Sequence, residues 1–203
     1  MNGSATVVRS GCMAKDADMI LSEFILLGIG GKELSEENAA QTAKALNIIQ
    51  PDFIRVHATG IKLESKLGEF VRDGSFTLQS EEEIVIEQKL FLQQLHEMDS
   101  YYVNEHIVNL LLEVRGNLRT EKQEMLSTID RFLTLPPDER LLFTVGRRLN
   151  IFFRLDDLKK PKLHQKAGES LQQILSKNPH VDFPRCAITS GSHKFRAENI
   201  SWA

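Results

Sequence analysis

The chain has 203 residues, of which 41% are hydrophobic and 26% are charged, and its formal net charge is −3. This balance is typical of a folded protein, and the negative charge argues against nucleic acid as the main partner. No apolar run reaches the length of about 18 residues that suggests a transmembrane helix, and the first residues lack the long apolar segment of a secretory signal. Two cysteines, Cys12 and Cys186, are too few for a disulfide framework or a four-cysteine metal site. We therefore expect an α-rich cytoplasmic protein that does not enter a membrane.

The first part of the chain predicts one βαβ unit. Residues 1–20 stay unassigned, because the first eighteen are small, polar and aperiodic. The apolar run over residues 24–27 ends at Gly28 and favours a buried strand, although its pattern alone also fits a helix. Ser35, followed by two glutamates and Asn38, predicts the start of a helix that ends before Pro51. The alternation over residues 53–58 predicts a second strand, parallel to the first.

The rest of the chain has the pattern of helices. Ser80, followed by three glutamates, predicts a capped helix whose apolar face extends to Met98. Further helices are expected over residues 105–114, with Gly116 after its end, over 120–133, from Pro136 and Pro137 onward, and over 164–176. Residues 178–203 are expected to form an irregular tail. Because two strands do not make a stable sheet, further strands should come from residues 1–20, from another copy, or from a longer protein.

The segment from Phe24 to Leu95 resembles the second half of a radical S-adenosylmethionine (SAM) domain. The similar features are the glycine turn, the helix start at Ser35, the strand after Pro51 and the loop that leads into the helix after Ser80. The resemblance continues more weakly to about residue 160. It implies an α/β fold, in which residues 21–98 form part of a (β/α) barrel and residues 99–177 form a mostly helical extension.

The resemblance also implies cofactors. In this family a [4Fe–4S] cluster, bound by the cysteines of a CxxxCxxC loop, cleaves SAM to a 5′-deoxyadenosyl radical. The sequence contains no such loop, because Cys12 and Cys186 are its only cysteines. We therefore expect this chain alone to bind neither the cluster nor, tightly, SAM, and to be inactive without the missing part.

Five residues are the predicted cofactor contacts. The resemblance implies that Gly28, Gly30 and Gly31 touch the amino-acid and ribose parts of SAM, and the alternative for them is a tight turn that needs glycine. Arg55 and His57 share one face of the second strand. In a barrel that face is the interior, where they would meet a carboxylate or an adenine, and the alternative is the solvated face of an edge strand.

Other polar residues suggest structural roles. His106 is expected to pack within a helix, with Asn104 and Asn109 as capping amides, and Arg147 and Arg148 are expected on a solvated helix face. The sequence contains no arrangement of metal ligands and no nucleophile motif of a hydrolase.

Two functional hypotheses follow. The chain is a portion of a radical SAM enzyme of unknown substrate, or it is a non-catalytic helical interaction module that retains a relic half-barrel. In both cases we expect a partner, either a second copy or the missing half of the barrel, because a half-barrel exposes sheet edges and the inner face of its strands.

Overall fold

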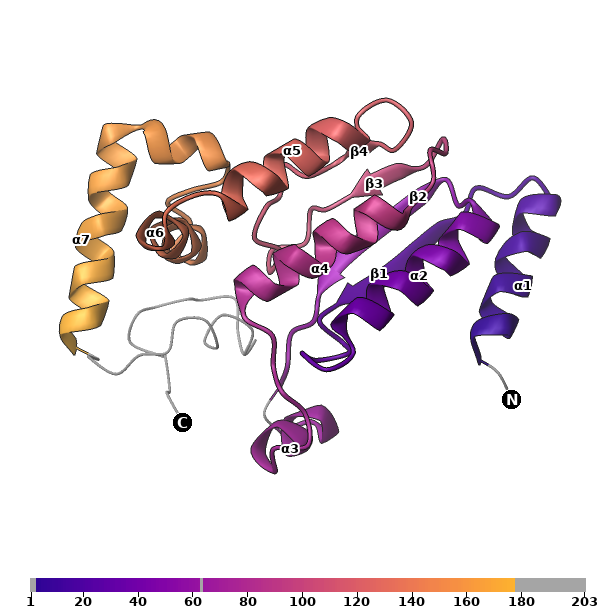
Figure 1. The fold of residues 1–203 in the computed structure, drawn as a ribbon, viewed down its shortest axis with the longest axis horizontal. Helices are drawn as coiled ribbons and strands as arrows, with labels where there is room; N and C mark the ends of the chain where they lie inside the picture. Colours follow the sequence, from indigo (N-terminus) through magenta and orange to yellow (C-terminus); the bar gives the residue numbers. More distant parts are fainter. Residues whose placement is uncertain (1–2, 63, 178–203) are drawn as a thin grey trace.

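The computed structural model describes residues 3–62 and 64–177 and shows an α/β protein with one mixed sheet (Figure 1). The four strands follow the order β1 (Ser22–Leu27), β2 (Phe53–Ala58), β3 (Tyr101–Val103) and β4 (Gly116–Asn117). β1, β2 and β3 are parallel, and β4 is antiparallel to β3. The prediction that the two sequence-derived strands are adjacent and parallel is therefore confirmed.

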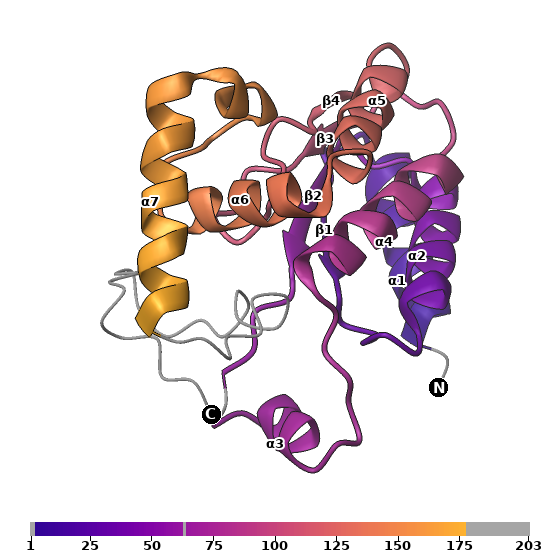
Figure 2. The same ribbon diagram turned by 60° about the vertical axis from the view of Figure 1, so that its left-hand side comes forward.

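The described part of the chain contains eight helical segments. They are α1 (Gly3–Asp16), α2 (Ser35–Ile49), α3 (Lys66–Arg72), α4 (Glu81–Gln94), α5 (Lys122–Leu133), α6 (Pro137–Arg148), the 3₁₀ helix η1 (Leu155–Lys159) and α7 (Pro161–Lys177). The connection that contains α3 projects from the lower end of the molecule, and α7 packs on α6 and η1 (Figures 1 and 2). None of these described helices combines the length and the hydropathy needed to cross a bilayer.

The helices cover only one face of the parallel strands. α2 and α4 lie side by side on that face, and α1 packs on α2 (Figures 1 and 2). Ile25 and Leu27 point into the core beneath them, whereas Phe24 and Leu26 on the opposite side are 64% and 47% exposed. We call this opposite side, which carries Phe24, Leu26, Arg55 and His57, the outer face. Its exposure is unusual, because parallel sheets are normally covered on both faces.

The core joins the sheet to the helices that follow it. Tyr102 of β3 is fully buried against Phe91 of α4, and its hydroxyl accepts a hydrogen bond of 3.1 Å from Nε2 of Gln88. Burial raises the pKa of the Tyr102 hydroxyl far above its ordinary value. Further along the chain, the ring of Phe143 lies between those of Phe132 and Phe152 and links α5, α6 and the segment after α6.

Arginines attach α6 to α4 and to the loop after β3. Arg148 forms a mostly buried ion pair with Glu81 at the start of α4, and Arg140 pairs with Glu82 at 2.9 Å. Arg147 is only 2% exposed and donates to the carbonyls of Leu110 and Asn109. The prediction that Arg147 and Arg148 lie on a solvated helix face is therefore wrong, because the acidic first turn of α4 and free loop carbonyls supply their partners.

Some predicted elements differ from the observed ones. The sequence leaves residues 1–20 unassigned, and in the structure residues 3–16 form α1, whose Gly11 allows close approach to Ile49 of α2. The further strands of the described sheet, β3 and β4, come from later in the chain and not from α1. Residues 105–114 form turns rather than a helix, because the side chain of Asn109 bonds to the backbone of β2. Gly116 therefore begins β4 instead of following a helix.

The predicted helix starts also differ in outcome. Ser80 caps α4, and with Glu83 it forms the predicted capping box. Ser35, by contrast, is the first helical residue of α2 and does not cap it, because its hydroxyl donates to Glu87 of α4. The prolines open α6 as predicted, since Pro137 is its first residue.

Two glycines in helices give a matched test of packing. A β-carbon on Gly146 of α6 would overlap the ring of Phe152, whereas one on Gly168 of α7 has nothing within 4 Å. We expect Gly146→Ala to lower the free energy of unfolding by about 1–3 kcal/mol, and Gly168→Ala to raise it by about 0.5–1 kcal/mol. Urea unfolding followed by circular dichroism measures both, and equal effects of the two substitutions would contradict this packing.

Candidate functional site

The glycine turn, residues 28–31, follows the carboxyl end of β1 and packs against the segment before α4. Gly28 and Gly31 have φ values of +83° and +62°, which favour glycine. A β-carbon on Gly31 would lie 2.9 Å from the carbonyl oxygen of Thr77. The amide of Lys32 donates to the same carbonyl at 3.0 Å. The turn therefore needs glycine for its own fold, whether or not it also contacts a ligand.

The side chain of Glu87 fixes the position of this turn. It is completely buried, and its carboxylate accepts hydrogen bonds from the Gly28 amide at 3.3 Å, from Oγ of Ser35 at 3.1 Å and from Nδ2 of Asn38 at 2.7 Å. These donors come from the end of β1 and the first turn of α2, while Glu87 belongs to α4. One carboxylate thus joins three elements at the carboxyl end of the sheet.

A buried amide oxygen lies beside the turn without a partner. Gln79 is 3% exposed, and its Nε2 donates to Oγ of Ser35 at 2.9 Å. Its Oε1 has no hydrogen-bond partner, and it lies 3.4 Å from the position of a β-carbon on Gly28. Buried acceptors without a donor are uncommon in folded proteins. Gln79 could therefore accept a hydrogen bond from an amino or hydroxyl group of a ligand at the turn.

Arg55 lies on the outer face between aromatic rings. Its guanidinium carbon is 5.9 Å from the ring centre of Phe24 and 5.7 Å from that of Phe53, within the range of cation–π contacts. Its Nε donates to Oγ of Ser22 at 3.0 Å. Among the described residues, Arg55 has no carboxylate partner.

Two imidazoles extend this aromatic row. The rings of His57 and His106 are stacked with centres 4.1 Å apart, and Phe24 meets His57 edge-on at 5.4 Å. Partial burial lowers the pKa of both histidines, and the nearby His106 and Arg55 lower that of His57 further. Nδ1 of His106 is buried without a hydrogen-bond partner. The outer face thus carries a continuous row of one cation and four aromatic rings.

Beyond the end of β3, the side chain of Asn109 forms the hydrogen bonds to the backbone of β2 that a neighbouring strand would otherwise form. Its Oδ1 accepts from the Ala58 amide and its Nδ2 donates to the Val56 carbonyl, both at 2.7 Å. Asn104 supports it, since Nδ2 of Asn109 also donates to Oδ1 of Asn104. The two amides therefore have a structural role, as the sequence suggested, but they bond to a strand and a loop rather than capping a helix.

The five predicted contact residues occupy two places. The three glycines, Gly28, Gly30 and Gly31, lie in the turn at the end of β1. Arg55 and His57 lie on the outer face, where they are the neighbours of Phe24 and Leu26 on the adjacent strand β1. Since a strand rises by about 3.3 Å per residue, Arg55 is about 13 Å from the turn along the sheet. β2 lies between β1 and β3, so the alternative of an edge strand is wrong for these two residues.

Sequence reasoning did not identify Glu87, Gln79 or the aromatic row. Glu87 has the helical spacing of the apolar face of α4, between Ile84 and Phe91, which was a signal of burial. The stack of His57 on His106 had no signal, because it depends on how the loop after β3 folds back.

The described residues do not fit an iron–sulfur cluster. Cys12 is the one cysteine among residues 3–62 and 64–177, and it lies in α1. In the same residues, no three histidine, cysteine, aspartate or glutamate side chains form a group that could hold a metal ion. Cluster ligands would have to come from outside this part of the chain.

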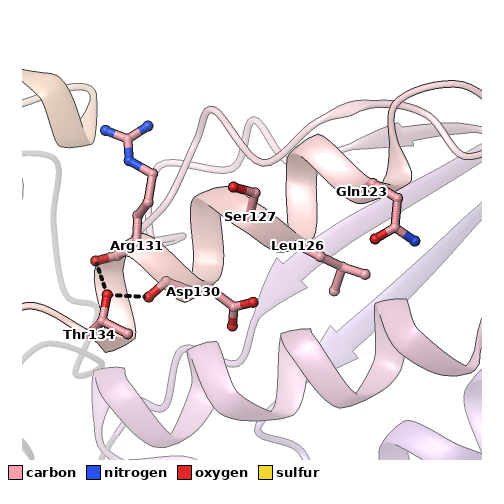
Figure 3. A pocket seen from close by; sticks show the side chains of 6 residues that line it. All are labelled: Gln123, Leu126, Ser127, Asp130, Arg131 and Thr134. Carbon is pink, nitrogen blue, oxygen red and sulfur yellow. Dashed lines mark hydrogen bonds between the residues drawn. The ribbon is translucent and has the colours of Figure 1, made fainter.

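A separate depression of about 330 Å³ runs along α5 (Figure 3). Its charged groups already have partners, since Asp130 pairs with Lys89 and Arg131 pairs with Asp156. The Thr134 hydroxyl donates to the carbonyls of Asp130 and Arg131. The depression is open and has no free charged group, so it is a weaker candidate than the strand ends and the outer face.

Comparisons with known protein families, with curated proteins and with solved structures found no match to this chain.

The contribution of the Glu87 carboxylate to stability can be tested by an isosteric substitution. Glu87→Gln would place an amide N–H₂ against groups that are all donors, so we expect a loss of about 2–4 kcal/mol in the free energy of unfolding. Glu37→Gln on the exposed side of α2 is the control and should change it by less than about 0.5 kcal/mol. Urea unfolding measures both variants, and a stable Glu87→Gln protein would show that these contacts are dispensable.

The two stacked histidines predict a pH dependence. Their pKa values are lower in the folded than in the unfolded chain, so the unfolded chain binds more protons below about pH 6.5. The free energy of unfolding should therefore fall between about pH 6.5 and pH 5. His57→Ala should reduce this fall in urea titrations, whereas His96→Ala, at an exposed position, should retain it. An unchanged fall in His57→Ala would contradict this assignment.

Proposed function

We propose that this chain is the SAM-binding portion of a radical SAM-type protein, whose substrate is unknown and whose cluster cysteines belong to another segment. One observation supports this proposal above the others. β1, β2 and β3 are parallel neighbours in chain order, and α2 and α4 cover the same face. This is the arrangement of the wall of a (β/α) barrel, whereas a doubly wound sheet has helices on both faces.

The strand ends support the position of the ligand. In barrels and open α/β sheets, ligands bind at the carboxyl ends of the strands, which here are the ends of β1 and β2 beside the glycine turn. The unpaired Oε1 of Gln79 lies next to Gly28 and could accept a hydrogen bond from the ammonium group of SAM. Arg55 and His57 lie on the outer face, the side of the sheet without helices. In a complete barrel this side of the strands would become the interior. The antiparallel β4 departs from a barrel wall. Both β3 and β4 lie within residues 99–177, which we expect to form the helical extension.

The cluster chemistry would need a second polypeptide segment. The described residues supply no ligand set for it. We therefore assign this chain the binding of SAM and no step of the radical reaction, and we expect it to be inactive alone, in the cytoplasm where thiolates stay reduced.

Nuclear magnetic resonance of the isolated chain tests the proposal. SAM at millimolar concentration should bind weakly and shift the amide signals of Gly28, Gly30 and Gly31. Gln79→Leu removes the unpaired acceptor and should reduce these shifts, whereas Gln93→Leu on the exposed side of α4 should not. Unchanged signals of the turn at saturating SAM would overturn the proposal. A CxxxCxxC sequence encoded in frame before residue 1 would support it independently.

A second candidate function is a non-catalytic interaction module. The observation that favours it is the apolar surface along the free edge strand β1, where Ile20, Phe24 and Leu26 are 81%, 64% and 47% exposed. Exposed edge strands with apolar side chains readily pair with other chains. Sedimentation of the wild type and of Phe24→Lys tests it, because the substitution should dissociate any complex that buries this face.

A further inference from the structure

We propose that the outer face binds a nucleoside phosphate, with the base stacked on the exposed ring of Phe24 beside His57 and the phosphate bound by Arg55. This inference goes beyond SAM binding at the glycine turn and rests on different residues. It depends on three observations: a guanidinium without a carboxylate partner among the described residues, an exposed aromatic ring on an uncovered sheet face, and two stacked imidazoles at the end of the row.

The guanidinium points to an anion. Five other arginines in the described residues pair with carboxylates, namely Arg115, Arg119, Arg131, Arg140 and Arg148. Arg55 instead bonds only to the Ser22 hydroxyl through Nε, among the described residues. Its terminal amino groups therefore remain available in a planar fork that matches two phosphate oxygens. SAM also offers a carboxylate, but its sulfonium and ammonium give it a net positive charge, so it is a poorer match for this group.

The rings point to a planar heterocycle. The Phe24 ring is 64% exposed on an uncovered sheet, next to Arg55 on one side and His57 on the other. Bases of nucleotides stack on aromatic side chains that stand on open sheet faces. The imidazole of His57 meets the Phe24 ring edge-on and is itself stacked on His106, so it borders the base rather than binding the phosphate. The phosphate is thus assigned to Arg55 alone.

The chain carries a net charge of −3, which repels a ligand with many phosphates, so we expect a ligand with few of them. A free mononucleotide and one nucleotide of a single strand share the same chemistry, a base with one phosphate. The experiment therefore compares adenosine 5′-monophosphate (AMP) with a hexa-adenylate RNA, and uses adenosine to isolate the contribution of the phosphate.

Isothermal titration calorimetry of the full chain tests the proposal. We expect AMP to bind about tenfold more tightly than adenosine, and Arg55→Gln to abolish this difference while leaving adenosine binding unchanged. Phe24→Ala should weaken AMP and adenosine together by about tenfold, because it removes the stacking surface. The thermal unfolding midpoint of each variant confirms that it is folded, as expected for partly exposed positions.

A second cation–aromatic pair supplies the matched control. Lys66 lies 6.0 Å from the ring centre of Phe70 on α3, and Phe70 is 40% exposed. Lys66→Gln and Phe70→Ala should leave the binding of AMP unchanged. Equal weakening by these controls, or a preference for AMP that persists in Arg55→Gln, would overturn the assignment to the outer face.

The ligands also separate the proposal from SAM binding. Tighter binding of hexa-adenylate than of AMP would identify a single strand as the source, and equal binding would identify a free nucleotide. Binding of AMP without SAM would support this inference and count against the proposed function. Binding of SAM with no saturable binding of AMP would overturn this inference and leave the proposed function standing.

Discussion

The carboxyl end of the sheet depends on one buried carboxylate. Glu87 accepts hydrogen bonds from the end of β1 and from the first turn of α2, although it lies between 49 and 59 residues later in the chain than these donors. Leaving any of these buried donors unpaired would cost free energy, so α4 can take only one rotation about its axis. That rotation directs Glu81 toward Arg148, and through this ion pair it also sets the position of α6.

The second constraint is the uneven covering of the sheet. Successive parallel strands with their helices on one side bury Ile54 and Val56 completely, while the side chains between them face outward. Sheets of this type are stable when something closes the other face. The guanidinium of Arg55 and the imidazoles beside it make this face partly polar, which lowers the free-energy cost of exposing it to water.

Elements that are defined by local sequence patterns could be predicted from the sequence. Elements whose conformation depends on contacts between distant residues could not. The βαβ unit and the capping box at Ser80 were predictable, because strand alternation and cap residues are local signals. β3 was missed because it has three residues, and the expected helix over residues 105–114 does not form because Asn109 bonds to β2. The alternation of Arg55 and His57 placed them on one face, but their aromatic neighbours come from β1 and from a distant loop.

The two neighbouring tyrosines of β3 provide an internal optical probe. The chain has only these two, and consecutive residues of a strand point to opposite faces. Tyr101 is 41% exposed on the outer face, while Tyr102 is in the core with a raised pKa. In alkaline solution the ultraviolet absorption of the Tyr102 tyrosinate should therefore develop only when the core opens. That absorption would thus report loss of the fold from a single buried ring.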